Sequence, residues 1–329
     1  MNTSQEVLLD VKDLKVHFSI PSGQLFKKPG LLKAVDGVSF QVKAGETLGV
    51  VGESGCGKST LGRAVLRLLK PTDGQVAWFG KEMGDMKSEE LRNVRSDLQV
   101  IFQDPLASLD PRMTIGQIIG EPLITHYPKL SKAEVKEKVK AMMAKVGLLP
   151  DQVNRYPHEF SGGQCQRIGI ARAMILEPKL IVCDEAVSAL DVSIQAQIVN
   201  LLMGLQKEFG LSLIFISHNL SIVRHISHRI MVLYLGRMME VADRDAIYAK
   251  PLHPYTKALI SAVPIPDPEI ERNKEHVALK GDLPSPLNPP SGCVFRTRCP
   301  FAKDICAAEV PALKSYAGDR EAACHFIEE

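Results

Sequence analysis

Apolar and polar positions near the N-terminus follow the alternating pattern of β-structure. Residues 7–18 read as one strand, and 33–51 continue the pattern with one glycine-containing interruption. The apolar run at 46–51 ends in glycine-rich sequence, after which 60–69 have helical spacing and stop before a proline. A strand, a glycine loop and a helix in this order predict a phosphate site.

The middle of the chain changes to helical spacing. Apolar side chains recur three or four positions apart within 132–146, at Val135, Val139, Met142, Met143 and Val146. We therefore expect residues from about 105 to 173 to form a helical subdomain inserted into an α/β core.

Strand patterns then return in alternation with helices. Apolar runs predict strands at 180–183, 213–217 and 230–234, and helical spacing is found at 194–207 and 220–225. This alternation is typical of an α/β fold with a parallel sheet.

Composition shifts after Pro264. Four prolines between 284 and 290 precede a group of four cysteines, which predicts an irregular C-terminal module. The expected organisation is a main domain at 1–263, with the helical insertion at about 105–173, followed by a small Cys/Pro-rich module at 264–329.

Charge and hydropathy exclude several classes of protein. The 329 residues carry 40 Lys and Arg against 38 Asp and Glu, so the net charge of +2 gives no electrostatic reason to expect a nucleic-acid partner. The first 14 residues lack the basic start and apolar run of a secretory signal, so export is not expected. Apolar runs elsewhere are much shorter than the roughly 20 residues of a membrane span. Any membrane role is therefore expected to depend on partner proteins.

The glycine-rich sequence after 46–51 matches GxxxxGK(S/T). Glycines let successive backbone N–H groups surround phosphate oxygens, and the following helix N-terminus adds positive potential. Lys58 is expected to reach the outer phosphates, and Ser59 to give its hydroxyl to Mg²⁺. A chance glycine turn is the alternative. The ATP-binding residues predicted in this loop are Gly52, Glu53, Ser54, Gly55, Cys56, Gly57, Lys58, Ser59 and Thr60.

Two carboxylates end the apolar strand predicted at 180–183. Asp184, at the carboxyl end of a strand near the phosphate loop, is expected to hold the Mg²⁺ shell. Glu185 is expected to polarise the attacking water. A helix-capping pair is the alternative for the same residues.

The sequence Ser161-Gly162-Gly163-Gln164 precedes an apolar helix. A hydroxyl and glycine amides at a helix N-terminus again suit a phosphate group. With the phosphate loop before it and the carboxylates after it, the chain resembles the nucleotide-binding subunits of ABC transporters. The resemblance implies a P-loop ABC-type fold, and it implies that Ser161 and Gly163 serve the ATP bound by an opposite, similar subunit.

The same resemblance gives roles to residues that carry little information alone. Gln103, after a strand predicted at 98–102, resembles the glutamine that senses Mg²⁺ and the membrane subunits. His218 resembles the switch histidine on the γ-phosphate, and 188–191 resemble a loop that contacts the opposite subunit. Phe18 is similar to the aromatic residue that stacks on adenine, with core packing as its alternative.

Two positions depart from the family pattern. Ala186 follows Glu185 where the family usually has Pro, and Asn219 follows His218 where Asp is common. Neither change removes a group assigned to the chemistry, so we expect them to affect turnover rate rather than function.

The C-terminal tail indicates a more specific group within the ABC transporter family. The C-terminal region of oligopeptide and dipeptide permease ATPases, most of all the second ATPase subunit of the oligopeptide permease, is similar to this chain at 252–256, 261–267, 281–286 and 289–293. The nearby cysteines are Cys293, Cys299, Cys306 and Cys324, with gaps wider than the paired spacing of structural zinc sites. Four thiolates can hold a 4Fe-4S cluster or zinc. The resemblance favours the cluster, and reduced structural cysteines are the third alternative.

The resemblance also implies cofactors, partners and a location. The cofactors are ATP and Mg²⁺, and the partners are a homologous ATPase subunit in a heterodimer, two transmembrane permease subunits and an extracytoplasmic peptide-binding protein. The chain would sit on the cytoplasmic face of the cell membrane and hydrolyse ATP to drive the import of oligopeptides or dipeptides.

The sequence features also bear on three other functions. An importer for another small solute, such as nickel or glutathione, would use the same ATPase chemistry. A DNA-repair-type ABC ATPase would need a long coiled-coil insertion, zinc-bearing DNA modules or a basic surface. The helical insertion does not supply the first of these features, and the charge does not supply the third. A ribosome-acting ABC protein usually has two cassettes, whereas this chain has one phosphate loop.

Overall fold

Two units divide the chain in this computed structural model, which describes residues 6–21, 30–264, 267–273, 279 and 281–327. The first unit combines residues up to Leu8 with Val42–Thr47 and Trp78–Ser217. The second combines Leu9–Gln41, Leu48–Ala77 and His218–Glu329. Residues 1–5 of the N-terminus, and 265–266 within the segment 261–267, lie outside the described residues. Each unit is therefore assembled from segments that are distant in sequence.

Parallel strands form the sheet of the first unit. Strand β7 (Leu180–Asp184) pairs with β6 (Leu98–Ile101) on one side and β8 (Ser212–Ile216) on the other. Every residue of β7 and β8 is buried. Strands covered on both faces are continuous apolar runs rather than alternating ones, which is why the sequence predicted these strands correctly.

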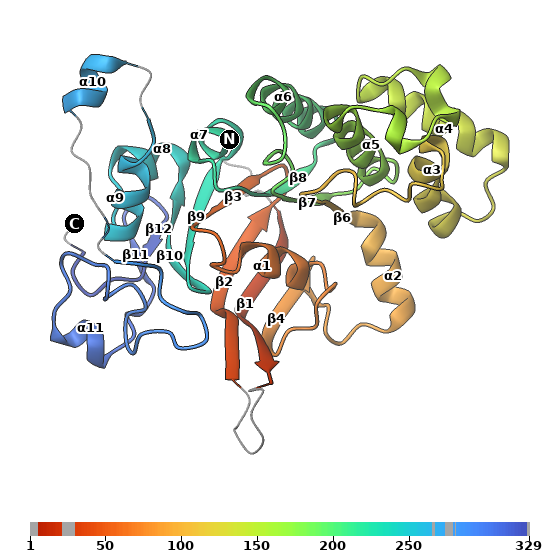
Figure 1. The fold of residues 1–329 in the computed structure, drawn as a ribbon. Coiled ribbons are helices and arrows are strands. Elements are labelled where there is room, and N and C mark those ends of the chain that lie inside the picture. The colour runs from red at the N-terminus through yellow and green to blue at the C-terminus, as the bar shows by residue number, and fades with distance from the viewer. Residues whose placement is uncertain (1–5, 22–29, 265–266, 274–278, 280, 328–329) are drawn as a thin grey trace. The chain divides into compact units, whose positions relative to one another are not determined.

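Helices occupy the region where the sequence predicted a helical subdomain. Helix α3 (Ile115–His126) packs against α4 (Lys132–Lys145) and α5 (Gly162–Met174), as Figure 1 shows. In α4 the side chains of Val139 and Met143 are buried, as their spacing predicts. Further elements of this unit are β5 (Lys81–Glu82), α2 (Ser88–Asp97), η1 (Pro150–Asn154), η2 (Pro157–Glu159) and α6 (Val192–Phe209). The bounds of the helical subdomain, about 105–173, stay a prediction.

The second unit has strands from two sheets. In one, β3 (Thr47–Val51) pairs in parallel with β9 (Arg229–Tyr234), which pairs antiparallel with β10 (Arg237–Asp243). The other has the order β2-β1-β4, formed by Gly30–Lys43, Val7–Ile20 and Asp73–Trp78. The helices are α1 (Lys58–Val65), α7 (Leu220–Ile226), α8 (Arg244–Ala249), α9 (Pro254–Ser261), α10 (Pro268–Asn273) and α11 (Asp304–Ala308). None of the helices in the described residues of either unit is long and apolar enough to cross a membrane.

Helix α1 ends earlier than the sequence predicted. Its last residue is Val65, whereas the predicted helix covered 60–69. Leu66 caps the helix, and Arg67 has a positive φ of 55°, which ends the α-helical backbone. The predicted end was wrong because a left-handed cap is usually recognised by Gly or Asn, and here the residue is Arg.

The tail contributes strands to the sheet of the second unit. Strand β12 (Arg320–Ala322) pairs antiparallel with β11 (Lys314–Tyr316) and with β10, where Glu240 lies opposite Ala322. The sequence predicted an irregular module here, because strands of three residues are too short to show alternation. A separate Cys/Pro-rich module is not confirmed, and the boundary between 263 and 264 stays a prediction.

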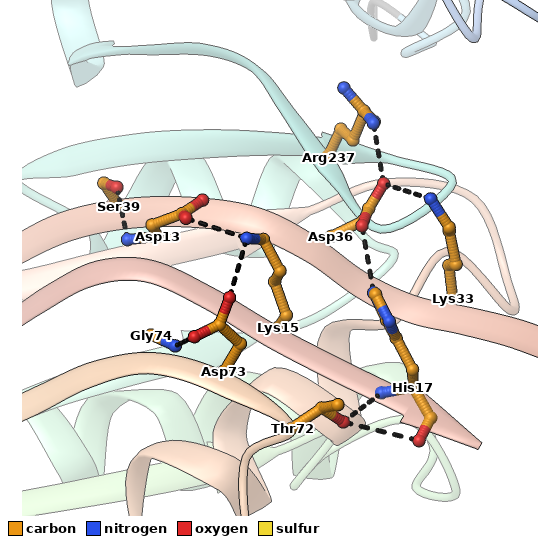
Figure 2. Close-up of polar contacts among 10 residues, drawn as sticks. All are labelled: Asp13, Lys15, His17, Lys33, Asp36, Ser39, Thr72, Asp73, Gly74 and Arg237. Carbon is orange, nitrogen blue, oxygen red and sulfur yellow. Dashed lines mark hydrogen bonds and ion pairs between the residues drawn. The ribbon is translucent and has the colours of Figure 1, made fainter.

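A part-buried ionic network joins three strands of the second unit. Asp36 in β2 accepts hydrogen bonds from His17 Nε2 in β1 (2.9 Å) and Arg237 Nη2 in β10 (2.6 Å), with Lys33 Nζ at 3.5 Å (Figure 2). Burial alone would raise the pKa of Asp36, but Arg237, His17 and Lys33 hold that pKa below its ordinary value. The carboxylate is therefore charged at neutral pH and links the strands.

Candidate functional site

The phosphate loop lies between β3 and α1 and has a backbone that requires glycine. Gly52 and Gly57 have φ values of 153° and 101°. A Cβ added at Gly52 would collide with the carbonyl oxygen of Leu233, and one added at Gly57 would collide with that of Ala34. Both carbonyl groups are backbone groups of other segments of the chain, so no change of a side-chain rotamer can relieve these contacts. The loop is therefore packed closely enough that only glycine fits at either end.

Lys58 closes the loop across its own backbone. Its side chain is 4% exposed, and Nζ donates to the carbonyl oxygens of Gly52 (2.8 Å) and Glu53 (3.0 Å). The lysine thus lies inside the curl of the loop, and its contact with the outer phosphates stays a prediction from the motif. Cys56 is buried, and burial raises the pKa of its thiol, so it serves as a small protonated packing group.

Two more predicted site residues, and one departure from the family pattern, belong to the second unit. Phe18 is 37% exposed on β1, an exposure open to stacking and unlike a core position. His218 is exposed and stands just before α7. Asn219 is the N-cap of α7, and its Oδ1 accepts from the N–H groups of Ser221 (3.0 Å) and Ile222 (3.3 Å). A cap role explains the departure at 219, because Asn and Asp cap helices equally well.

The first unit brings Gln103, Asp184 and Glu185 to one edge of its sheet. Asp184 ends β7 and is 3% exposed. Gln103 follows β6, and its Nε2 donates to Glu185 Oε2 at 3.2 Å. Parallel pairing of β6 with β7 places these strand ends side by side. Two of the residues predicted for Mg²⁺ and the predicted base are therefore neighbours.

Glu185 has a backbone conformation that side chains rarely adopt. Its φ is 49°, in the left-handed region. The N–H donates to the carbonyl oxygen of Ile216 (3.1 Å), and the Glu185 carbonyl accepts from both the N–H (3.1 Å) and the hydroxyl (2.9 Å) of Ser188. Such strain of about 1–3 kcal/mol persists only where surrounding contacts impose it, and it is concentrated at functional sites. Ala186, the other departure from the family pattern, is buried after this turn.

Ser161 begins helix α5 with a reciprocal cap. Its Oγ accepts from Gln164 N–H (3.4 Å), and Gln164 Oε1 accepts from Ser161 N–H (2.9 Å). Ser161 and Gly162 are exposed, whereas a Cβ at Gly163 would lie 2.7 Å from Ile194 Cγ2. The N-terminus of α5 is therefore open on one side, and it offers N–H groups and positive potential to an anion.

The predicted site residues are thus divided between the two units of the chain. The phosphate loop, Phe18 and His218 belong to the second unit, and Gln103, Ser161, Gly163, Asp184 and Glu185 belong to the first. The roles of all these residues stay proposals.

The four tail cysteines line one cavity of about 320 Å³, together with Phe295. Burial raises the pKa of Cys293 to about 11 and also raises the pKa values of the Cys299 and Cys324 thiols. In the part of the chain that the structure describes, no three Cys, His, Asp or Glu side chains are arranged to hold a metal ion. This arrangement does not support the predicted 4Fe-4S cluster or zinc, because the thiols share a cavity without forming a ligand set.

Sequence reasoning missed two residues that contact the phosphate loop. Tyr255 in α9 and Arg298 in the tail both hydrogen-bond to Glu53. The segment at 252–256 was noted for its resemblance, but no pattern in the sequence links positions 255 or 298 with 53.

Comparison with known proteins covers nearly the whole chain. Residues 35–188 match the ABC transporter family, and 239–306 match the oligopeptide/dipeptide transporter C-terminal region. The oligopeptide transport ATP-binding protein OppF of Salmonella typhimurium is 66% identical over 312 residues, covering 94% of this chain and 93% of that protein. The oligopeptide transport ATP-binding protein AppF of Bacillus subtilis is 55% identical over 324 residues, covering 98% of each.

Solved structures agree with the fold. The post-hydrolysis dimer of the ATP-binding cassette MJ0796, bound to ADP and Pi, has a TM-score of 0.64 at 28% identity and covers 72% of this chain and 99% of its own. CbiO1 of Clostridium perfringens, part of an ABC transporter complex, also has a TM-score of 0.64, at 25% identity. The fold is therefore that of a P-loop ABC ATPase, and the chain belongs to the family of ATP-binding subunits of oligopeptide and dipeptide ABC transporters.

Proposed function

We propose that this chain is the ATP-hydrolysing subunit of an ABC importer for oligopeptides or dipeptides. The observation that carries the proposal is the match, at 66% identity over 94% of the chain, to a protein named for oligopeptide transport and ATP binding. The glycine-dependent phosphate loop with Lys58 inside it supports the same chemistry.

Residues of the second unit would bind the nucleotide. Backbone N–H groups of the loop at 52–60 and the Lys58 ammonium group hold the phosphates, and Phe18 stacks on adenine. His218 contacts the γ-phosphate. The Ser59 hydroxyl, together with Asp184 and Gln103 of the first unit, would hold Mg²⁺, and this ion would neutralise charge on the transferred phosphoryl group.

Glu185 would orient and polarise the attacking water. Its carboxylate accepts a hydrogen bond from Gln103, so a change at this glutamine can alter the position of the base. Ser161 and Gly163, at the open N-terminus of α5, bind the γ-phosphate of ATP held by the opposite subunit. Hydrolysis then needs two subunits, each of which supplies part of each site.

The assembly that fits this mechanism has four partner proteins of three kinds. They are a homologous ATPase subunit in a heterodimer, two transmembrane permease subunits and an extracytoplasmic peptide-binding protein. In this assembly the chain is peripheral, on the cytoplasmic face of the cell membrane. Nucleic acid has no part in it.

The proposal includes a metal centre in the tail. The four cysteine thiols around one cavity would have to converge to hold a 4Fe-4S cluster, or zinc as the alternative. No step of ATP hydrolysis is assigned to this centre. Iron and zinc contents of the wild type and Cys299→Ala test it, and equal metal contents would remove Cys299 from the ligands.

Peptide uptake in cells that lack the chain tests the function. We expect wild type to restore uptake, and neither Lys58→Ala nor Glu185→Gln to do so. Lys58→Ala should lose ATP binding, whereas Glu185→Gln should bind ATP without hydrolysing it. Normal peptide uptake without the chain would refute the peptide cargo and leave an ATPase for another small solute.

A further inference from the structure

The tail forms an ion pair with the phosphate loop. Arg298 Nη1 lies 2.8 Å from both Oε1 and Oε2 of Glu53, although the two residues are 245 positions apart. The Arg298 and Glu53 side chains are only 11% and 26% exposed. An ion pair that is hydrogen-bonded and largely shielded from water is considerably stronger than an exposed pair.

Tyr255 also contacts Glu53, through the Glu53 backbone. The Glu53 N–H donates to the Tyr255 hydroxyl oxygen at 3.0 Å. Tyr255 is fully buried, and its ring contacts Tyr234 (centroids 4.8 Å apart) and Phe295 of the tail (5.3 Å). Burial raises the pKa of the Tyr255 hydroxyl, so the acceptor stays neutral. A ring fixed in such a cluster gives the loop a rigid support.

Glu53 is therefore fixed at three points. Its N–H is bound by Tyr255, its carboxylate by Arg298, and its carbonyl oxygen by Lys58 Nζ. Two of these partners come from beyond the phosphate-loop motif, whereas Lys58 is the residue expected to reach the outer phosphates. A shift of Glu53 would also move an acceptor that positions the Lys58 ammonium group.

Of the two contacts that Glu53 makes outside the phosphate-loop motif, the one with Arg298 should affect ATP binding more than the one with Tyr255, because Arg298 is charged. Glu53 puts a carboxylate on the loop that is expected to bind a polyphosphate. An unpaired carboxylate in a partly buried site repels an anion and weakens its binding. Arg298 neutralises this charge from the side of the tail.

We infer that Arg298, supported by Tyr255, is a positioning residue that keeps the phosphate loop receptive to ATP by neutralising and fixing Glu53. This inference rests on the proposed function, because it assumes that the loop binds ATP. If Arg298 has this role, nucleotide affinity depends on the tail, although the tail is distant in sequence from the nucleotide-binding motifs.

The chain offers a matched control two residues away. Arg296 is also a tail arginine, but its Nε and Nη2 donate to the backbone oxygen and hydroxyl of Ser291, within the tail. A variant at 296 disturbs the tail without touching Glu53. Comparing variants at 298 and 296 therefore distinguishes the loss of the contact with Glu53 from a general loss of tail structure.

The experiment measures ATP affinity and hydrolysis of the full-length chain assembled with its partner subunits. We expect Arg298→Gln to raise the ATP dissociation constant and KM about tenfold, with kcat at saturating ATP unchanged. Arg298→Lys should recover part of the affinity, and Arg296→Gln should match wild type. In a Glu53→Gln background, Arg298→Gln should have little further effect, because no carboxylate is left to neutralise.

Three results would overturn the inference: unchanged affinity in Arg298→Gln, an equal loss in Arg296→Gln, or the same loss with Glu53→Gln present. Lys58→Ala keeps this test separate from the proposed function. If Lys58→Ala binds ATP normally, the phosphate-loop assignment itself fails; if it loses ATP while Arg298→Gln does not, only the inference fails. Should Arg298→Gln not fold, Arg298→Lys against Arg296→Lys takes its place, and equal ATP affinities of these two overturn the inference.

Discussion

Glu185 combines a strained backbone with the group proposed as the general base. Its φ of 49° is costly for any residue with a Cβ, and hydrogen bonds to Ile216 and Ser188 hold it there. Glu185→Gly and Glu185→Ala both remove the carboxylate and the contact with Gln103, but only glycine accepts this φ without strain. We expect the glycine variant to be more stable than the alanine variant by about 1 kcal/mol, as measured by chemical denaturation.

This order of stability is informative because a glycine variant is normally less stable than the corresponding alanine variant. Neither variant should hydrolyse ATP. An alanine variant as stable as the glycine variant would mean that the left-handed backbone is not imposed on this position.

Asp36 should make the second unit sensitive to acid. The cations around it lower its pKa, so its contribution to the free energy of unfolding is present above the unfolded-state pKa of about 3.9 and is lost as the pH falls below that value. Asp36→Asn should cost about 2 kcal/mol at pH 7, and the difference from wild type should shrink toward pH 3.

Asp13 provides the comparison for this titration. It also pairs with a cation, Lys15, but its side chain is 65% exposed, and exposed ion pairs contribute little. Denaturation of Asp13→Asn should follow wild type at every pH. Equal losses for the two Asn variants would show that the network at Asp36 has no special role.

At the level of whole elements, the chain repeats one cap in three helices. Thr114 begins α3, Ser131 begins α4 and Ser161 begins α5, each with a reciprocal capping box. Alanine at any of the three should cost about 1 kcal/mol of stability. Only Ser161→Ala should also lower ATP hydrolysis by the assembled complex, because only this cap is proposed to face the ATP of the opposite subunit.

Thermal unfolding and ATPase assays of the three alanine variants measure both effects. A similar loss of ATPase activity in Ser131→Ala would assign the effect to helix stability and remove Ser161 from the binding site.

Burial and spacing explain which elements the sequence revealed. Strands β7 and β8 were predictable because every position in them is buried and each contains a continuous apolar run of four residues. Helix α4 was predictable because its apolar side chains keep helical spacing. Strands β11 and β12 were missed because three residues cannot show a period. The contact of Arg298 with Glu53 was missed for another reason: an ion pair between positions 245 apart has no local pattern.

On the scale of the whole molecule, the tail shares an apolar cluster with the cassette core of the second unit. Phe295 is 1% exposed, and its ring lies against Tyr234 at the end of β9 and Tyr255 in α9. Strand β12 adds backbone hydrogen bonds to β10. Residues on both sides of the predicted boundary at 263 therefore contribute to one core.

A shared core should unfold as one cooperative unit. Phe295→Ala should destabilise that unit by about 3–5 kcal/mol, the usual cost of removing a buried aromatic ring. Calorimetry should show the transition of the unit shifted to lower temperature, and hydrogen exchange should speed up together in β9, in β10 and in the phosphate loop. Phe301→Ala is the control, because Phe301 lies in the same tail but is 58% exposed. If Phe295→Ala instead produced a separate early transition confined to residues after 263, the tail would be an independent domain, and its contacts with Glu53 could not stabilise the loop.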